Sequence, residues 1–138
     1  MFGFQAAGAA PIVDGHPVAE PETVASAIRI GNPASWQNAT AALQESDGHI
    51  DKVTDEEILA AYKLIARTEG ILVEPASAAP LAGLAKCVTA GLIPKGSLIA
   101  ATMTGHGLKD PDCAIKSAGI KPILVEPTKE AVMKVIGL

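Results

Sequence analysis

The turn Thr104-Gly105-His106-Gly107 places a hydroxyl, an imidazole and two glycines directly after an apolar run. We expect residues 97–103 to form a buried strand, which puts the turn at the carboxyl end, where open parallel sheets bind their ligands. Gly105 removes side-chain bulk, so a flat ligand could approach the backbone, and Thr104 offers a neutral donor and acceptor. Because such turns are also common without a ligand, this turn alone is a weak indication of a small-ligand site.

A second strand-to-helix junction follows the apolar residues 71–73, in the segment from Glu74 to Ala79. Backbone amides at the start of the expected helix could hold an anion or a carboxylate. The plainer alternative is a capped helix, with Ser77 as its N-cap and Glu74 as a structural carboxylate that accepts hydrogen bonds from nearby amides. The residues alone leave both interpretations open.

Other side chains give weaker indications of chemistry. His106 has no acid or nucleophile near it in the sequence, which is unusual for a general base. No group of His, Cys, Asp and Glu residues has the spacing of a metal site. Cys87 and Cys113 are not part of a CxxC pair, so we expect two reduced thiols in a cytoplasmic protein.

The elements that position these residues alternate between strands and helices. The pattern predicts strands at residues 1–5, 71–73, 97–103 and 122–125, and helices at about 21–31, 34–45, 54–70, 77–91, 108–116 and 127–136. Thr54 and Glu57 have the spacing of a capping box, which makes the third helix the clearest. We therefore predict an α/β fold, a partial three-layer parallel sheet with helices on both faces, in one domain over residues 1–138.

Composition narrows the class of protein. Hydrophobic residues make up 49% of the 138 and charged residues 19%, which is enough apolar material for a core. The net charge of −4, without a basic cluster, argues against nucleic-acid binding. No apolar run has the length of a membrane helix, and the first residues lack a signal-peptide pattern. Residues 1–5 have the pattern of a strand without a polar lead-in, so we expect Met1 to come from the interior of a longer protein.

Five segments, in order and with similar gaps, resemble the C-terminal portion of bacterial threonine synthases. They are residues 2–11 (FGFQAAGAAP), 23–36 (TVASAIRIGNPASW), 55–61 (DEEILAA), 69–79 (EGILVEPASAA) and 102–111 (TMTGHGLKDP). The resemblance implies the tryptophan-synthase-β-like fold, pyridoxal 5'-phosphate as cofactor, and conversion of O-phospho-L-homoserine and water into L-threonine and phosphate. It also implies a cytoplasmic enzyme of threonine biosynthesis that is a homodimer when intact.

The same resemblance implies roles for four residues. Thr104 matches the threonine whose hydroxyl bonds the pyridine nitrogen of the cofactor, and Gly105 keeps that turn open. Glu74 and Ser77 match a segment near the cofactor. None of the nine lysines lies in the family's motif for the Schiff-base lysine, and the phosphate-binding glycine/asparagine loop is absent. We therefore expect no catalytic residue in this chain, and no activity from the chain alone.

Two alternatives to this function stay open. One is a threonine-dehydratase-like lyase, which would use the same cofactor and fold. The other is a stand-alone module that binds a small anion at residues 74–79 and needs no cofactor.

Overall fold

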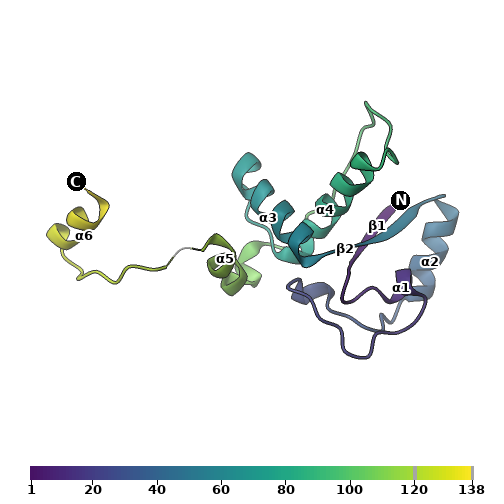
Figure 1. Ribbon diagram of the computed structural model, residues 1–138, viewed down its shortest axis with the longest axis horizontal. Helices are drawn as coiled ribbons and strands as arrows, with labels where there is room; N and C mark the ends of the chain where they lie inside the picture. Colours follow the sequence, from purple (N-terminus) through teal and green to yellow (C-terminus); the bar gives the residue numbers. More distant parts are fainter. Residues whose placement is uncertain (120, 138) are drawn as a thin grey trace.

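The computed structural model describes residues 1–119 and 121–137 and confirms an α/β fold with a small parallel sheet (Figure 1). Strands β1 (Phe2–Ala6) and β2 (His49–Val53) pair in register, from Phe2 opposite His49 to Ala6 opposite Val53. Parallel neighbours need a long crossover. This crossover contains α1 (Pro11–Asp14), the 3-10 turn η1 (Ser26–Ile28) and α2 (Trp36–Glu45).

Helices dominate the rest of the described chain. They are α3 (Asp55–Glu69), α4 (Pro75–Thr89), the 3-10 turn η2 (Gly107–Lys109), α5 (Pro111–Ala118) and α6 (Lys129–Ile136). Figure 1 shows α3 and α4 on one side of the two strands, α1 and α2 on the other, and α6 apart from the rest. Among the described residues, no helix combines the length and the apolar character that crossing a membrane requires.

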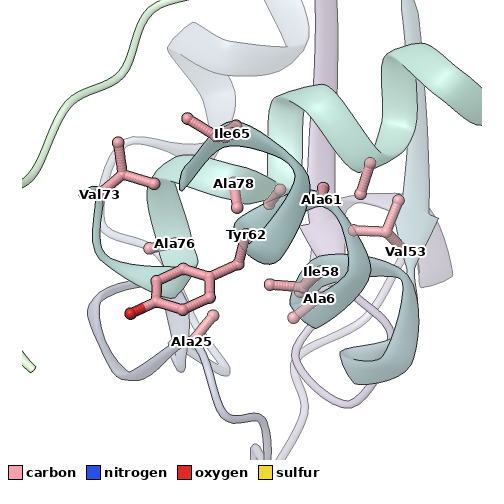
Figure 2. Close-up of a cluster of buried hydrophobic side chains, with 12 residues drawn as sticks. Ala6, Ala25, Val53, Ile58, Ala61, Tyr62, Ile65, Val73, Ala76 and Ala78 are labelled. Carbon is pink, nitrogen blue, oxygen red and sulfur yellow. The ribbon is translucent and has the colours of Figure 1, made fainter. Parts of the chain in front are cut away.

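The core lies where α3 and α4 meet and where both approach the strands (Figure 2). Helix α3 supplies its large buried side chains, and α4 supplies mainly alanines, which let the two helices pack closely. The buried members from the two helices are Ile58, Ala61, Tyr62, Ile65, Ala76, Ala78, Ala79 and Ala82. Ala6 and Val53 add the ends of the two strands. The first turn of α4 is therefore held firmly against the core.

Helix α4 also approaches β1 closely, because Gly83 faces the ring of Phe4. A Cβ atom added at Gly83 would lie well inside 3.0 Å of three atoms of that ring. The contact places α4, and the candidate site residues at its start, close to the sheet.

We expect Gly83→Ala to destabilise the protein by about 1–3 kcal/mol, because the methyl group must displace the Phe4 ring. In an unobstructed helix the same change would stabilise the protein by about 1 kcal/mol. The sign of the change in unfolding free energy therefore shows whether the Phe4 ring packs against Gly83. Urea unfolding at low protein concentration measures it. The double variant Phe4→Leu/Gly83→Ala should recover part of the loss, whereas a single variant more stable than wild type would contradict this packing.

Half-exposed ion pairs connect α4 and α1 to β2. Lys86 Nζ lies 2.8 Å from Asp51 Oδ2 and donates at 2.8 Å to the Lys52 carbonyl. The hydrogen bond between these side chains lowers the pKa of Asp51 and raises the pKa of Lys86. Lys52 Nζ in turn lies 2.7 Å from Asp14 Oδ1. Exposed pairs of this kind contribute little stability, so they mainly fix the relative placement of the elements.

Helix α3 confirms the expected capping box. Thr54 Oγ1 accepts from the backbone N–H of Glu57 at 3.2 Å, and Glu57 Oε2 accepts from the N–H of Thr54 at 2.8 Å. The helix ends at Gly70, whose φ of 68° lies in the left-handed region that glycine adopts without strain. The expected α2 and α6 are also present, each beginning two residues later than predicted.

The strands expected at 71–73, 97–103 and 122–125 are wrong. Val73 forms only an isolated antiparallel bridge with His106. Residues 97–103 and 122–125 have no strand assignment, and most of their side chains are exposed. An apolar run records a preference for burial, but a strand also needs a neighbour to pair with. Within residues 1–119 and 121–137, neither 97–103 nor 122–125 pairs with a strand, and 71–73 forms only the single bridge. Strand β2 was not predicted, because its sequence HIDKV is too polar to resemble a buried strand.

The helix expected at 21–31 is also wrong, because only residues 26–28 form a 3-10 turn. The Asp55 carboxylate accepts from the Thr23 hydroxyl and, at 3.0 Å, from the Val24 N–H, which holds this segment extended across the start of α3. Gly31 is not a helix cap. It is buried against the Val18 carbonyl, where a Cβ atom would clash.

Candidate functional site

The structure brings the two predicted segments together at the start of α4. Residues 72–74 run antiparallel to the turn 104–107. The Glu74 N–H donates to the Gly105 carbonyl at 3.0 Å, and the Gly107 N–H donates to the Leu72 carbonyl at 2.9 Å. The four residues singled out from the sequence (Glu74, Ser77, Thr104 and Gly105) therefore form one cluster.

Ser77 joins the two segments through its side chain. It is 1% exposed, and its Oγ accepts from the Gly105 N–H at 2.7 Å. The Ser77 hydroxyl also lies 3.1 Å from Thr104 Oγ1 and 3.3 Å from the Gly105 carbonyl oxygen. The expectation that Ser77 is the N-cap is wrong. Pro75, which favours the first helical position, starts α4 earlier, so Glu74 is the N-cap and Ser77 lies inside the first turn.

Glu74 carries a carboxylate that is almost fully enclosed. Its side chain is 7% exposed, and Oε1 lies 3.3 Å from Lys109 Nζ. The positive end of the α4 dipole also favours a carboxylate here. The contacts of the Glu74 carboxylate thus include an ion pair with Lys109, which sequence reasoning missed because the two residues are 35 positions apart.

Position 105 requires a glycine, because the Glu74 side chain approaches the backbone there closely. A Cβ atom at this position would overlap the carboxylate of Glu74, so any larger residue would displace that side chain or the turn. The structure therefore explains the glycine by its contact with Glu74, and its expected role toward a cofactor stays a prediction.

Thr104 is exposed and lies on an apolar groove of about 650 Å³. We call this feature the β1 groove. Its walls include Phe2 and Phe4 of β1, Pro80 and Leu84 of α4, and the extended residues 97–102. The Thr104 hydroxyl is a polar group on an otherwise mainly apolar surface, and its described hydrogen-bond partner is Ser77.

The donor set fits one edge of a flat aromatic cofactor. Apolar walls suit the faces of a ring, and a neutral hydroxyl can donate to or accept from a ring nitrogen. Lys109, the lysine beside the turn, has its ammonium group directed to Glu74. The described cluster therefore has a hydroxyl that could contact a ring, and its lysine ammonium group is already paired with Glu74.

His106 has a structural role in this turn. Its Nδ1 accepts from the Leu108 N–H at 3.1 Å and so caps η2. This contact requires an unprotonated Nδ1, and it accounts for the histidine without a role as a general base.

Comparison with known proteins identifies the class. Residues 1–105 match the family model described as "Pyridoxal-phosphate dependent enzyme", a range that includes Glu74, Ser77, Thr104 and Gly105. The chain belongs to this family of pyridoxal-phosphate-dependent enzymes.

Its curated relatives carry a more specific name. The threonine synthase of Mycobacterium tuberculosis is 55% identical over 139 residues, which cover 100% of this chain and 38% of the relative. The threonine synthase of Bacillus sp. (strain ULM1) is 60% identical over 117 residues, covering 85% of this chain and 33% of the relative. The threonine synthase of Methanocaldococcus jannaschii is 50% identical over 134 residues, covering 91% of this chain and 33% of the relative. The chain thus spans 33–38% of the length of these relatives.

A solved structure supports the fold. The crystal structure of a threonine deaminase from T.th. matches 68% of this chain and 33% of its own chain, with a TM-score of 0.53 and 24% sequence identity. This likeness is one of fold alone.

Proposed function

We propose that this chain is the C-terminal portion of the catalytic domain of a threonine synthase, which converts O-phospho-L-homoserine and water into L-threonine and phosphate. The observation that carries the proposal is the 55% identity to the Mycobacterium tuberculosis threonine synthase over 100% of this chain. The cluster at the start of α4 supports it, because the Thr104 hydroxyl lies on an apolar groove and could contact the ring of pyridoxal phosphate. The remaining parts of the site, including the lysine that holds the cofactor, are proposed to lie N-terminal to this portion.

The residues of this chain would bind and orient one edge of the cofactor. Bound pyridoxal phosphate supplies an electron sink for a carbanion beside the substrate nitrogen. Thr104 would meet the ring nitrogen with a hydroxyl, which does not force that nitrogen to be protonated as a carboxylate would. Gly105 would let the ring approach the turn, and the β1 groove would keep water from its apolar edge.

The two alternatives have less support. A threonine-dehydratase-like lyase would have the same fold, but the likeness to threonine deaminase, at 24% identity, shows the fold alone, whereas a threonine synthase is 55% identical. The stand-alone anion module is opposed by Glu74, whose enclosed carboxylate lies at the start of α4 where the anion would bind.

A chimera tests the proposed reaction. Residues 1–138 would replace the 139 matched residues of the Mycobacterium tuberculosis threonine synthase, and the product would be supplied with pyridoxal phosphate. We expect release of phosphate from O-phospho-L-homoserine and no appreciable release of ammonia from L-threonine. Ammonia from L-threonine without phosphate release would favour the dehydratase, and a folded chimera that binds no cofactor would overturn both enzymes.

We also infer that the intact enzyme is a cytoplasmic homodimer. The inference rests on the resemblance to threonine synthases. Sedimentation of the chimera at twice the protomer mass would support the dimer, and a monomer at micromolar concentration would oppose it.

We expect Thr104→Ala in the chimera to weaken cofactor binding about 2- to 12-fold and to change its absorption spectrum, because one hydrogen bond of about 0.5–1.5 kcal/mol is lost. Covalent attachment should persist, since the lysine lies elsewhere. Thr102→Ala is the matched control, because Thr102 is also exposed and also lines the β1 groove. Equal affinity and an identical spectrum for wild type and Thr104→Ala would remove Thr104 from the site.

A further inference from the structure

We propose that Ser77 is a positioning residue, which orients the Thr104 hydroxyl and lets it serve the cofactor's ring nitrogen either as a donor or as an acceptor. The inference rests on the proposed function, because it concerns the contact between Thr104 and the ring. The role is additional to the place of Ser77 in the helix, because a residue in the first turn of α4 needs no hydroxyl for the helix to form.

The oxygen of Ser77 is fixed from three directions. The residue lies in the first turn of α4, against the core, with 1% of its surface exposed. Its Oγ accepts from the Gly105 N–H at 2.7 Å, which is the shortest of the three contacts it makes with the turn. Thr104, by contrast, is exposed, so its hydroxyl depends on Ser77 for its orientation.

Counting protons shows that the hydroxyl pair has two complete arrangements. In the first, Ser77 donates to Thr104 Oγ1 across 3.1 Å, which leaves the proton of Thr104 free to donate to an unprotonated ring nitrogen. In the second, Ser77 donates to the Gly105 carbonyl across 3.3 Å, and Thr104 donates to Ser77 Oγ. Thr104 Oγ1 can then accept from a protonated ring nitrogen.

The two arrangements differ only by rotation of two hydroxyl groups. No heavy atom has to move, and the Gly105 N–H stays bonded to Ser77 Oγ in both, because a hydroxyl oxygen has two lone pairs. The pair can therefore follow a change in protonation of the ring nitrogen, whereas an acidic residue in the place of Thr104 would favour the protonated form.

Loss of the Ser77 hydroxyl would release both partners. Ser77→Ala leaves the buried Gly105 N–H without its acceptor and frees the Thr104 side chain to change rotamer. Because the Thr104 oxygen would then be less well placed, the ring nitrogen should sense the change although Ser77 itself does not touch the ring.

The ¹⁵N resonance of the cofactor tests this inference. The chimera would be loaded with pyridoxal phosphate labelled at the ring nitrogen, and the ¹⁵N shift would be followed against pH. We expect Thr104→Val to move the shift, Ser77→Ala to move it in the same direction with about 2- to 12-fold weaker cofactor binding, and Ser77→Thr to stay near wild type. Ala79→Gly is the control, because it loosens the start of α4 without removing a hydroxyl, and it should not move the shift.

The outcomes separate this inference from the proposed function. If Thr104→Val does not move the ¹⁵N shift, Thr104 does not contact the ring, and both proposals for this turn are overturned. If Thr104→Val moves it and Ser77→Ala does not, only the role of Ser77 is overturned. If Ser77→Ala fails to fold, Ser77→Cys is used, since a thiol fills the site with a slightly larger atom but donates and accepts only weakly. An unchanged shift in that variant overturns the inference, and a shift toward that of Thr104→Val supports it.

Discussion

The 138-residue chain alone is expected to release phosphate from O-phospho-L-homoserine on the order of 10³-fold or more slowly than the chimera, even with excess pyridoxal phosphate. This prediction rests on the expectation, carried by the resemblance, that none of the nine lysines is the Schiff-base lysine, because covalent catalysis fails when the group that forms the bond is missing. A continuous phosphate assay on both proteins, at equal concentration, measures the ratio.

One lysine serves as an internal check on this expectation. Lys109 is beside the Thr104 turn, with its Nζ 3.3 Å from the Glu74 carboxylate. Turnover by the chain alone at a rate close to that of the chimera would contradict the account. If Lys109→Met then abolished that turnover, the catalytic amine would lie in this chain after all.

The second large effect is self-association of the 138-residue chain. The β1 groove and the segment beside it expose large apolar side chains, with Phe2 47%, Leu92 52% and Leu98 102% exposed. The extended residues 97–103 also have backbone groups without a strand partner among residues 1–119 and 121–137. Exposed apolar patches and unpaired extended segments drive association. We expect concentration-dependent oligomers by light scattering and strong binding of an apolar dye.

A matched pair of variants locates the surface responsible. Ile99 lies in the β1 groove and is 45% exposed, whereas Ile30 is exposed to a similar 48% but does not line that groove. Ile99→Lys should raise the concentration at which oligomers form, and Ile30→Lys should change it little. A monomeric wild-type chain at high concentration, with little dye binding, would show that this surface does not drive self-association.

Local signals in the sequence predicted some elements well. The capping box at Thr54 and Glu57 and the apolar face of α3 depend on residues within one helix, so the sequence contains all that is needed. The same holds for α2 and α6. The motifs singled out Thr104, Gly105, Glu74 and Ser77 as candidate site residues. The structure brings these four residues into contact.

Elements that depend on distant partners could not be predicted from local signals. Strand β2 exists because it pairs with β1, which lies far away in the sequence, and its own residues are too polar to indicate burial. The opposite error occurred at 97–103, where an apolar run has no partner in the described residues.

The partners of the site side chains also escaped prediction. Ser77 resembled an N-cap, but Pro75 starts α4 earlier and leaves the Ser77 hydroxyl to bond the turn 27–28 positions ahead. The ion pair between Glu74 and Lys109 depends in the same way on two segments that meet only in the fold.

Growth of a strain that lacks threonine synthase tests the central claim most directly. The strain would carry the chimera, the 138-residue chain alone, or an empty vector, on medium without threonine, with protein levels and cofactor content measured in parallel. We predict growth with the chimera and none with the chain alone or the empty vector. A chimera that accumulates, folds and binds pyridoxal phosphate, yet does not support growth and releases no phosphate from O-phospho-L-homoserine, would contradict the proposal that this chain is part of a threonine synthase.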